Sequence, residues 1–383
     1  MLRWFNASNL NQTLLEKIIS LVWYKVLPPL FGGQKGIAHF NQYLSLHYPL
    51  VCVCSDNNQP KGELPYKVLP VLPTGQKHVL NPLYWRKVKQ IARQEKATAI
   101  ILEHPYQGIA AWLAAKAIKA RFIVHSHNIE SNRFRQIGKW WWPLLQRYEK
   151  WVHRRASLNL FKTREDQEWA VQHFGLSAEK CLIIPYGVEQ PVMAPEDGQK
   201  LRRQYGIGAE EKILLFAGTL DYEPNAKAVE DIFSAIAPRL RAAGMPFRII
   251  ICGRNRFPAF QYLNKLADTS VIMAGEQVSI DPYFVAADVF INPVLSGGGI
   301  QTKNIDAIAH GCNTVCFSSQ ATGIPAHECG TKLSIAENGN WDHFTSLVIQ
   351  AAAHKDPTPR SFFAYFDWNR ILQPLIHNLQ AHE

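Results

Sequence analysis

Short runs of apolar and β-branched residues alternate with longer segments of helical periodicity along this chain, and this alternation restricts its fold more than any other feature. The first half contains such runs at residues 18–23, 50–54, 99–102, 122–124, 158–161 and 181–184. The second half contains them at residues 213–216, 247–252, 271–273, 289–292 and 314–317. Alternation of this kind is typical of βαβ units built on a parallel sheet. The sequence therefore predicts an α/β fold with two sheets, one formed by each half of the chain.

A stretch rich in proline and glycine separates the two series. Pro185, Gly187, Pro191 and Pro195 interrupt both periodicities before the second series begins. A chain of 383 residues is also long for a single hydrophobic core. We therefore expect two Rossmann-like domains, residues 1–188 and residues 189–359. The last segment, residues 360–380, has the pattern of an amphipathic helix that is kinked or interrupted near Pro374.

The composition is that of an ordinary globular protein. Apolar residues make up 47% of the chain and charged residues 19%. The seven cysteines are scattered and lack the spacing of a zinc site, so we expect neither a disulfide framework nor a bound metal. No apolar run approaches the roughly 20 residues that cross a bilayer, and the N-terminus has no signal-peptide pattern. These features predict a cytoplasmic protein.

Positive charge is concentrated in the first half. Residues 1–190 contain 25 Lys and Arg against 12 Asp and Glu, whereas residues 191–383 contain 16 against 19. A basic domain attracts polyanions such as nucleic acid, anionic lipid headgroups or a phosphorylated acceptor. The chain has no recognisable nucleic-acid module, so we expect no nucleic-acid partner.

The strongest candidate site follows the predicted strand at residues 289–292. A glycine triplet, residues 297–299, precedes a helix that we expect to begin near Thr302. Glycines allow a ligand to approach the backbone closely, and the free N–H groups at a helix start favour phosphate. Lys303 lies in the first helical turn, where a bound anion explains a cation better than helix stability does. Asp306 lies on the same face and can accept hydrogen bonds from a ribose or sugar hydroxyl.

A second candidate joins the predicted strand at residues 213–216 to another helix. Gly218 and Thr219 form the turn, and Pro224 and Asn225 suit a helix start. Because open α/β sheets bind ligands at the carboxyl ends of their strands, this turn predicts further backbone donors at the same edge.

Two stretches of the first half are weaker candidates. Gly33 belongs to a glycine-rich stretch that we expect to form a loop of close approach. His125, His127, Asn128 and Glu130 follow a predicted strand. A single histidine beside a strand is more often a satisfied core residue, whereas two of them with Asn and Glu favour a site.

Residues 138–155 interleave aromatic and basic side chains. Tryptophan prefers the membrane interface, and each basic side chain near an anionic surface adds about 1 kcal/mol. The stretch is consistent with a peripheral membrane contact. It is equally consistent with tryptophans that fill a core while the charges are solvated.

Together these stretches resemble the retaining glycosyltransferases of family four, which have the GT-B fold. The similarity is most specific at residues 218–225 and 297–311, and weaker at residues 127–130 and 185–189. It implies a second domain that binds a nucleoside diphosphate sugar and a C-terminal helix, residues 360–383, that completes the first domain.

The resemblance also implies roles for particular residues. The diphosphate would lie near Gly298, Gly299, Ile300 and Lys303, and Asp306 would hold the ribose. Arg254, Gln277 and Val278 would contact the base. His127 would lie over the transferred sugar. The remaining substrate-binding residues would be Gly33, Asn128, Glu130, Gly218, Thr219 and Asn225.

The sequence departs from the family pattern at three charged positions. Of the usual pair of glutamates, the second is replaced by Asp306 and the first by Gly298. The usual Arg and Lys that neutralise the diphosphate are replaced by Thr219 and, approximately, Asn225. Lys303 and backbone amides would then neutralise the donor.

The implied activity is sugar transfer with retention to an acceptor hydroxyl of a glycan or lipid-linked acceptor, in cell-surface polysaccharide or glycolipid synthesis, without a cofactor. An anionic membrane surface is a further expected partner. Two alternatives remain open. One is a nucleotide-sugar epimerase, for which Glu130 is the clearest proton carrier. The other is a catalytically inactive protein of the same fold. A nicotinamide-dependent oxidoreductase is disfavoured because the Gly-x-Gly-x-x-Gly fingerprint is missing.

Overall fold

A computed structural model describes residues 17–29, 32–74, 81, 84–191, 195–297 and 299–381 of the chain. The chain divides into two compact units. One comprises Met1–Ser126 with Lys150–Leu160, and the other His127–Glu149 with Phe161–Glu383. The domain boundaries that the sequence suggests, near residues 188 and 359, stay a prediction.

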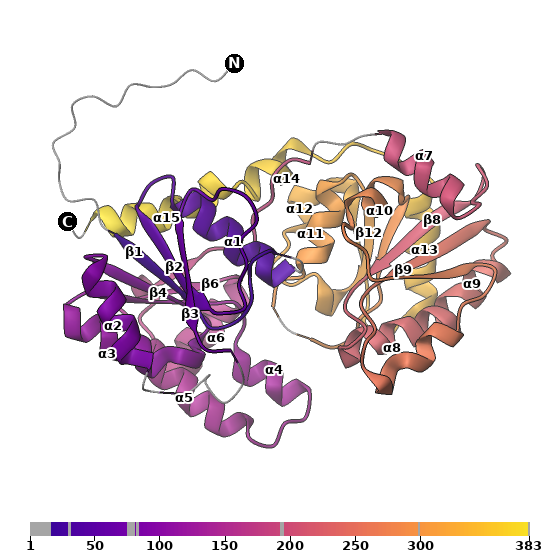
Figure 1. Ribbon diagram of the computed structural model, residues 1–383. Helices are drawn as coiled ribbons and strands as arrows, with labels where there is room; N and C mark the ends of the chain where they lie inside the picture. Colours follow the sequence, from indigo (N-terminus) through magenta and orange to yellow (C-terminus); the bar gives the residue numbers. More distant parts are fainter. Residues whose placement is uncertain are drawn as a thin grey trace, which may run out of the picture. The chain divides into compact units, whose positions relative to one another are not determined.

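The first sheet has seven strands in the order β3-β2-β1-β4-β5-β6-β7 (Figure 1). Its strands are β1 (Ile18–Val22), β2 (Leu50–Ser55), β3 (Lys67–Leu72), β4 (Ala99–Glu103), β5 (Arg121–Ser126), β6 (Leu158–Phe161) and β7 (Cys181–Ile183). The pairs from β3 through β5 are parallel. Strands β1, β2 and β4 are buried along their whole length, which explains why most of their residues are apolar.

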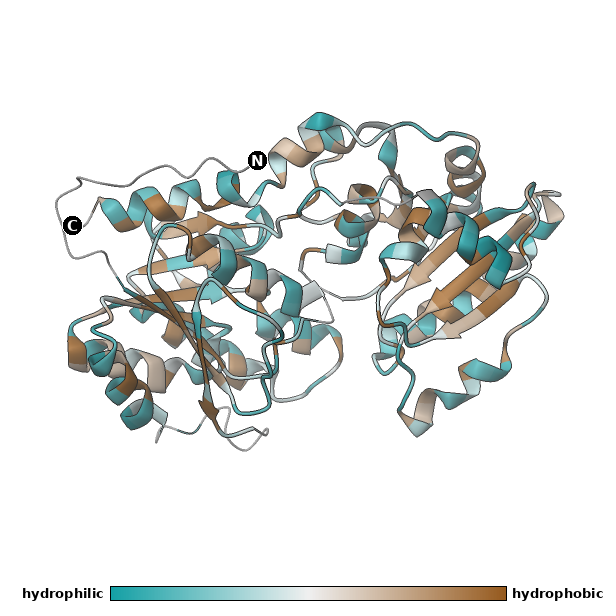
Figure 2. Ribbon diagram, turned by 45° about the horizontal axis from the view of Figure 1, so that its top comes forward, coloured by the Kyte–Doolittle hydropathy of each residue, from teal (hydrophilic) through white to brown (hydrophobic). Residues whose placement is uncertain are grey.

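The second sheet has six strands in the order β10-β9-β8-β11-β12-β13, all in parallel pairs. Its strands are β8 (Lys212–Ala217), β9 (Phe247–Cys252), β10 (Val271–Gly275), β11 (Val289–Asn292), β12 (Asn313–Phe317) and β13 (Leu333–Ala336). Figure 2 shows the strands as the most hydrophobic elements of the chain. The expected α/β fold with two parallel sheets is confirmed.

Helices join the strands in both units, as βαβ units require. Those of the first half are α1 (Gly32–Leu44), α2 (Tyr84–Gln94), α3 (Gly108–Ile118), α4 (Glu130–Gln136), α5 (Trp142–Arg155) and α6 (Arg164–Phe174). Those of the second half are α7 (Pro195–Gln204), α8 (Glu223–Asp231), α9 (Ala237–Ala242), α10 (Asp281–Ala286), α11 (Thr302–Ala309), α12 (Ala326–Cys329), α13 (Trp341–Ala352), α14 (Arg360–Tyr365) and α15 (Trp368–Gln380). None of the helices in the described part of the chain is long and apolar enough to cross a bilayer.

Strand β8 shows how the second sheet is buried on both faces. Leu214 and Phe216 belong to a core cluster that also holds side chains of α8 and α13. Ile213 and Leu215, which alternate with them, belong to a second cluster with side chains of α7 and α10. This alternation follows from the two-residue period of a strand.

Three details differ from the sequence expectations. Strands β3 and β13 were not predicted. The C-terminal segment is interrupted before Trp368, where the side chain of Asp367 accepts a hydrogen bond from the backbone N–H of Arg370, and Pro374 lies within α15. The stretch that contains Gly33 is not a loop: Gly33 lies in the first turn of α1, whose buried Ile37, Phe40 and Leu44 hold the helix in place.

Candidate functional site

The second sheet has a topological switch point between β8 and β11. Strands β8 and β11 are neighbours in the sheet. The strand that follows β8 in sequence, β9, lies on one side of this pair, and the strand that follows β11, β12, lies on the other side. Open α/β sheets bind ligands outside the carboxyl ends of the strands at such a point. The chain leaves β8 through Gly218 and Thr219, and it leaves β11 through the glycine triplet that precedes α11. The two strongest candidate sites of the sequence therefore follow adjacent strands.

Asn225 links the loop after β8 to α11. Its side-chain Nδ2 donates a hydrogen bond to the carbonyl of Thr219 at 2.9 Å. Its Oδ1 lies 3.4 Å from the Nζ of Lys303. A Cβ at Gly218 would lie 2.9 Å from Asn225 Nδ2, which explains why glycine occupies this position. The structure thus brings together Gly218, Thr219, Asn225 and Lys303, all of which were predicted.

Lys303 lies at the second position of α11, as expected. Its ammonium group contacts two uncharged partners, the Asn225 amide and the ring of Phe216, whose centroid is 5.0 Å away. Burial lowers the pKa of Lys303 to about 7. The partial positive charge of a helix N-terminus also disfavours a proton there. An anion at this position would relieve both effects, so the arrangement suits a phosphate group.

Buried amides hold the chain on both sides of the glycine triplet. Asn292 Nδ2 donates to Asn304 Oδ1 at 2.9 Å, and Asn304 Nδ2 donates to the carbonyl of Gln320 at 2.9 Å. All three side chains are buried. The sequence analysis did not assign a role to these residues, since nothing in one strand and one helix shows that their amides meet.

Asp306 and the triplet have further partners within the same unit. Tyr186 Oη donates to Asp306 Oδ1 at 3.0 Å, and burial followed by the Asp306 carboxylate raises the pKa of Tyr186. Gly299 has a φ of 76°, and a Cβ there would lie 1.7 Å from Asn128 Oδ1. Ile300 is partly buried against the cluster that contains Tyr186. Gly298 lies outside the described residues.

The residues predicted to contact a base follow β9 and β10. Arg254 Nε binds Asp221 Oδ2 at 2.7 Å, and Asp221 also accepts the backbone N–H groups of Arg256 and Phe257. Burial opposes ionisation of Asp221, but these amides and the guanidinium hold its pKa below the usual value. Gln277 Nε2 donates to the carbonyl of Ala274 at 2.6 Å. Val278 is fully exposed.

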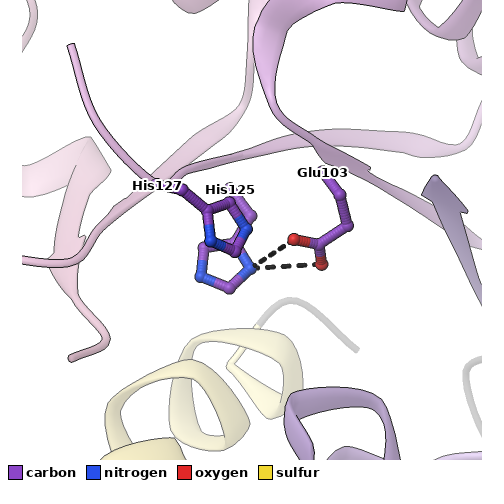
Figure 3. Close-up of side chains that lie close together, drawn as sticks. All are labelled: Glu103, His125 and His127. Carbon is purple, nitrogen blue, oxygen red and sulfur yellow. Dashed lines mark hydrogen bonds and ion pairs between the residues drawn. The ribbon is translucent and has the colours of Figure 1, made fainter. Parts of the chain in front are cut away.

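In the first unit, His125 is fully buried and is paired with a carboxylate through Nδ1. Its Nδ1 lies 3.0 Å from a carboxylate oxygen of Glu103, both side chains are fully buried, and Figure 3 shows this pair. His127, also drawn, follows the end of β5 as expected. We expected no metal, and that stays a prediction.

Glu130 begins α4 and is bound by its own helix. Its Oε2 accepts from Arg133 at 2.6 and 2.9 Å, and its Oε1 lies 3.5 Å from Asn128 Nδ2. The buried Glu149 of α5 accepts the backbone N–H groups of Glu130 and Ser131 at 2.9 and 3.0 Å and the Ser131 hydroxyl at 2.7 Å. Glu149 therefore fixes the start of α4, and the sequence analysis missed it.

Aromatic side chains gather at the switch point of the first sheet, between β1 and β4. Trp23 and Tyr24 follow β1, and His104 and Tyr106 follow β4. The ring centroids of Trp23 and Tyr106 are 5.1 Å apart, and those of Tyr24 and His104 are 5.6 Å apart. His104 has a φ of 66°, a backbone conformation that is unusual for a non-glycine residue and is found repeatedly at functional sites. The sequence analysis missed these four residues, and the only feature that could have identified them is their position directly after two apolar runs.

A cavity of about 550 Å³ lies beside α8. Glu223, Lys227 and Glu230 of α8 line it, together with Tyr262 and Ser296. None of the predicted site residues belongs to its lining. Its lining does include Pro224 and Ala226, which flank Asn225 in the chain.

Comparison with known proteins identifies the family models that the chain matches. Residues 39–190 match the model described as Glycosyltransferase Family 4, and residues 211–354 match the model described as Glycosyl transferases group 1. The two matches together span most of both sheets. No curated protein gives a significant match to the sequence.

Solved structures share the fold at low sequence identity. HepE from Anabaena, in complex with UDP, aligns with a TM-score of 0.71 and 16% identity over 95% of this chain and 100% of its own. Sucrose-phosphate synthase from Thermosynechococcus elongatus aligns with a TM-score of 0.72 and 15% identity over 96% of this chain and 100% of its own. A glycosyltransferase from Rickettsia africae aligns with a TM-score of 0.68 and 13% identity over 95% of this chain and 98% of its own. These likenesses establish the GT-B fold.

Proposed function

Because the chain belongs to family four of the glycosyltransferases, we propose that it transfers a hexose from a nucleoside diphosphate sugar to an acceptor hydroxyl with retention of anomeric configuration. The observation that carries the proposal is the meeting of the Thr219 loop with Lys303 at the switch point of the second sheet. A diphosphate at this point would receive hydrogen bonds from the backbone N–H groups of the glycine triplet and the start of α11. Lys303 would supply the positive charge.

The reaction breaks the bond between the anomeric carbon and the diphosphate oxygen and forms a bond to the acceptor oxygen. The hydroxyl proton leaves with the diphosphate or passes to solvent. Negative charge grows on the departing diphosphate, so preorganised donors aimed at it lower the barrier. Lys303 fits this role because a bound diphosphate would raise its pKa from about 7 and keep it protonated. Asp306 and His127 keep their proposed roles at the ribose and the transferred sugar.

We favour a UDP-sugar as the donor. HepE, which shares the fold, was solved with UDP and with UDP-glucose. Arg254, Gln277 and Val278 follow the two strands beyond β8 at the same sheet edge, which supports a base-binding role for them. No cofactor or metal enters this proposal.

The acceptor is proposed to be a glycan or lipid-linked sugar in the synthesis of a cell-surface polysaccharide or glycolipid. The aromatic group of Trp23, Tyr24, His104 and Tyr106 supports this class. Aromatic rings offer apolar faces on which a sugar ring can pack, and they lie at the switch point of the first sheet. Substitution of Tyr106 by Ala should therefore raise KM for the acceptor more than KM for the donor.

A second candidate is a protein of this fold that has lost activity. It is favoured by the departures at Gly298, Thr219 and Asn225, where the family usually has charged residues. The epimerase alternative receives less support, because its proton carrier Glu130 is held in an ion pair with Arg133 at 2.6 Å.

The first experiment is a thermal-stability titration with UDP, GDP, ADP and CMP. A ligand that binds only the folded state raises the thermal midpoint as its concentration exceeds its Kd. Selective stabilisation by UDP supports the donor proposal, and loss of that stabilisation in Lys303→Ala assigns it to α11. No response of the folded protein to any nucleotide would favour the inactive alternative. If turnover is found, Lys303→Ala should lower it at least roughly tenfold, the effect of about 1.4 kcal/mol of transition-state stabilisation.

A further inference from the structure

The hairpin of α4 and α5 carries an unusual concentration of positive charge. Figure 1 shows the two helices as neighbours along the chain. Residues 130–155 contain seven Lys and Arg and two carboxylates, Glu130 and Glu149. Glu130 is buried and paired with Arg133. Glu149 is fully buried and is occupied by three hydrogen bonds from the start of α4. The exposed charged side chains of the hairpin are therefore all basic.

The same hairpin exposes large apolar side chains. Trp140 is 83% exposed and Leu144 is 59% exposed. The two neighbouring tryptophans behave differently: the Trp141 ring packs 4.5 Å from that of Phe134, and Arg135 lies 5.0 Å above the Trp142 ring. Trp141 and Trp142 are thus half-buried, whereas Trp140 lies at the surface. An explanation of the whole cluster as core packing does not account for Trp140.

Exposed basic and apolar side chains lie on one face. Lys139 and Trp140 lie in the turn before α5, and Leu144 and Arg147 follow at helical spacing. Lys139 and Arg147 are exposed, and neither forms an ion pair within the part of the chain that the structure describes. A face with unpaired cations around a tryptophan and a leucine is complementary to an anionic lipid surface, which attracts the cations and accepts the apolar groups at its interface.

We propose that this face, defined by Lys139, Trp140, Leu144 and Arg147, docks the protein on a bilayer that contains anionic phospholipids. Trp140 and Leu144 insert at the level of the headgroups, and the two cations contact lipid phosphates. A nucleic-acid partner would explain the positive charge of this face but not its exposed leucine beside the tryptophan. An anionic lipid surface explains both the cations and the apolar side chains. The proposal does not depend on the proposed glycosyl transfer.

The test is flotation of the purified full chain with vesicles at 0.15 M NaCl. We expect binding to vesicles of phosphatidylcholine with 30% phosphatidylglycerol and weak binding to phosphatidylcholine alone. The partition coefficient of the variant Lys139→Gln/Arg147→Gln onto anionic vesicles should be roughly thirtyfold lower. Each lost cation costs about 1 kcal/mol of binding free energy, and about 1.4 kcal/mol corresponds to a factor of ten. The variant Trp140→Ser/Leu144→Ser should lose most of the binding to anionic vesicles.

Matched controls change the same chemistry elsewhere. Leu46 is 63% exposed and Lys61 and Lys265 are also exposed, so Leu46→Ser and Lys61→Gln/Lys265→Gln should bind vesicles as the wild type does. The proposal is overturned if the wild type ignores both kinds of vesicle, or if the hairpin variants bind as well as the controls. Tighter retention on duplex DNA than on anionic vesicles at the same salt would also overturn it, in favour of nucleic acid.

A labelling experiment avoids dependence on the double variants. All seven native cysteines are buried, so a Trp140→Cys protein can be labelled at one exposed position with an environment-sensitive dye. Anionic vesicles should shift its emission to the blue. A label at Lys61→Cys should show no shift, and equal shifts at the two positions would contradict docking through the hairpin.

Discussion

The ammonium of Lys303 lies 3.4 Å from the side-chain oxygen of Asn225, at the start of α11. A neutral amide at this distance leaves the positive charge of Lys303 uncompensated, and burial lowers its pKa to about 7. Removal of an ammonium from water without a compensating anion is costly. The pair is therefore arranged for a ligand that brings negative charge, and two predictions follow from it.

We first expect UDP binding to weaken as the pH rises above 7. The free protein loses the Lys303 proton in that range, whereas a bound diphosphate raises the pKa, so binding above pH 7 takes up a proton. The loss of affinity should approach tenfold per pH unit between pH 8 and pH 9. Calorimetry in buffers of different ionisation enthalpy measures both the affinity and the proton uptake. The variant Lys303→Met should show weaker binding and no uptake, and an uptake that survives this substitution would assign the proton to another group.

The second prediction concerns Asn225→Asp. A carboxylate beside Lys303 should raise the pKa of that lysine, since an opposite charge favours its protonated form. It should also repel the diphosphate, with a loss of UDP affinity of about tenfold, or about 1.4 kcal/mol. Asn264→Asp, at an exposed position, adds the same charge as a control. Equal affinities of the two variants would show that Asn225 is remote from the donor.

The sequence predicted strands where both faces are buried. Strands β1, β2, β8 and β11 consist mostly of apolar residues because they are buried on both faces of their sheets. Strand β3 was not predicted because it is an edge strand with mostly exposed or half-buried residues and a proline at position 70. Strand β13 was not predicted either. It is an edge strand of only four residues, and two of them are half-buried.

The predictable part of the site lies within single strand-turn-helix units. Gly218, Asn225 and Lys303 could be found because the turn and the helix start follow their strand within a few residues. Contacts between distant segments left no local signal. Tyr186 and Asp306 are 120 residues apart in sequence, and their hydrogen bond depends on the packing of the segment after β7 against α11. The glycine pattern around Gly33 led to a wrong local structure, since the burial of one face of α1 outweighs the low helix propensity of two glycines.

Gly187 should be intolerant of any side chain. A Cβ there would lie 2.5 Å from the indole of the fully buried Trp368, and the backbone at Val188 is paired with the segment at Asp367. Gly187→Ala must displace the indole, and overpacking of this kind costs about 1–3 kcal/mol of unfolding free energy. Urea denaturation measures the loss.

The control for this substitution is Gly33→Ala. Its Cβ would have no neighbour nearer than the Tyr24 hydroxyl at 4.0 Å, and Gly33 lies in the first turn of α1. Alanine reduces the conformational freedom of the unfolded chain, so this variant should be as stable as the wild type or slightly more stable. An equal loss of stability in both variants would show that the contact with Trp368 is not the cause in Gly187→Ala.

The last prediction concerns the pH dependence that Glu149 gives to stability. Burial raises its pKa to about 7 from 4.5, although hydrogen bonds from Ser131 and Glu130 favour the charged form. Because the folded-state pKa lies above the unfolded value, the stabilising contribution of this group is complete below about pH 4.5 and is lost as the pH rises through about 7. The free energy of unfolding should therefore gain up to about 1.4 kcal/mol per unit from Glu149 as the pH falls across this window.

Comparison of the wild type with Glu149→Gln isolates this contribution. Asp166, with a pKa that burial raises to about 6, and His153, with a pKa that burial lowers to about 4, titrate in both proteins and cancel in the difference. The variant also leaves one N–H at the start of α4 without its acceptor, which lowers stability by about 1–3 kcal/mol at pH 7. Urea denaturation between pH 5 and pH 8 should give profiles that diverge toward low pH, with the wild type the more stable protein. Parallel profiles would mean that Glu149 has the same proton affinity in the folded and unfolded chains, and the start of α4 would then be held by neutral hydrogen bonds alone.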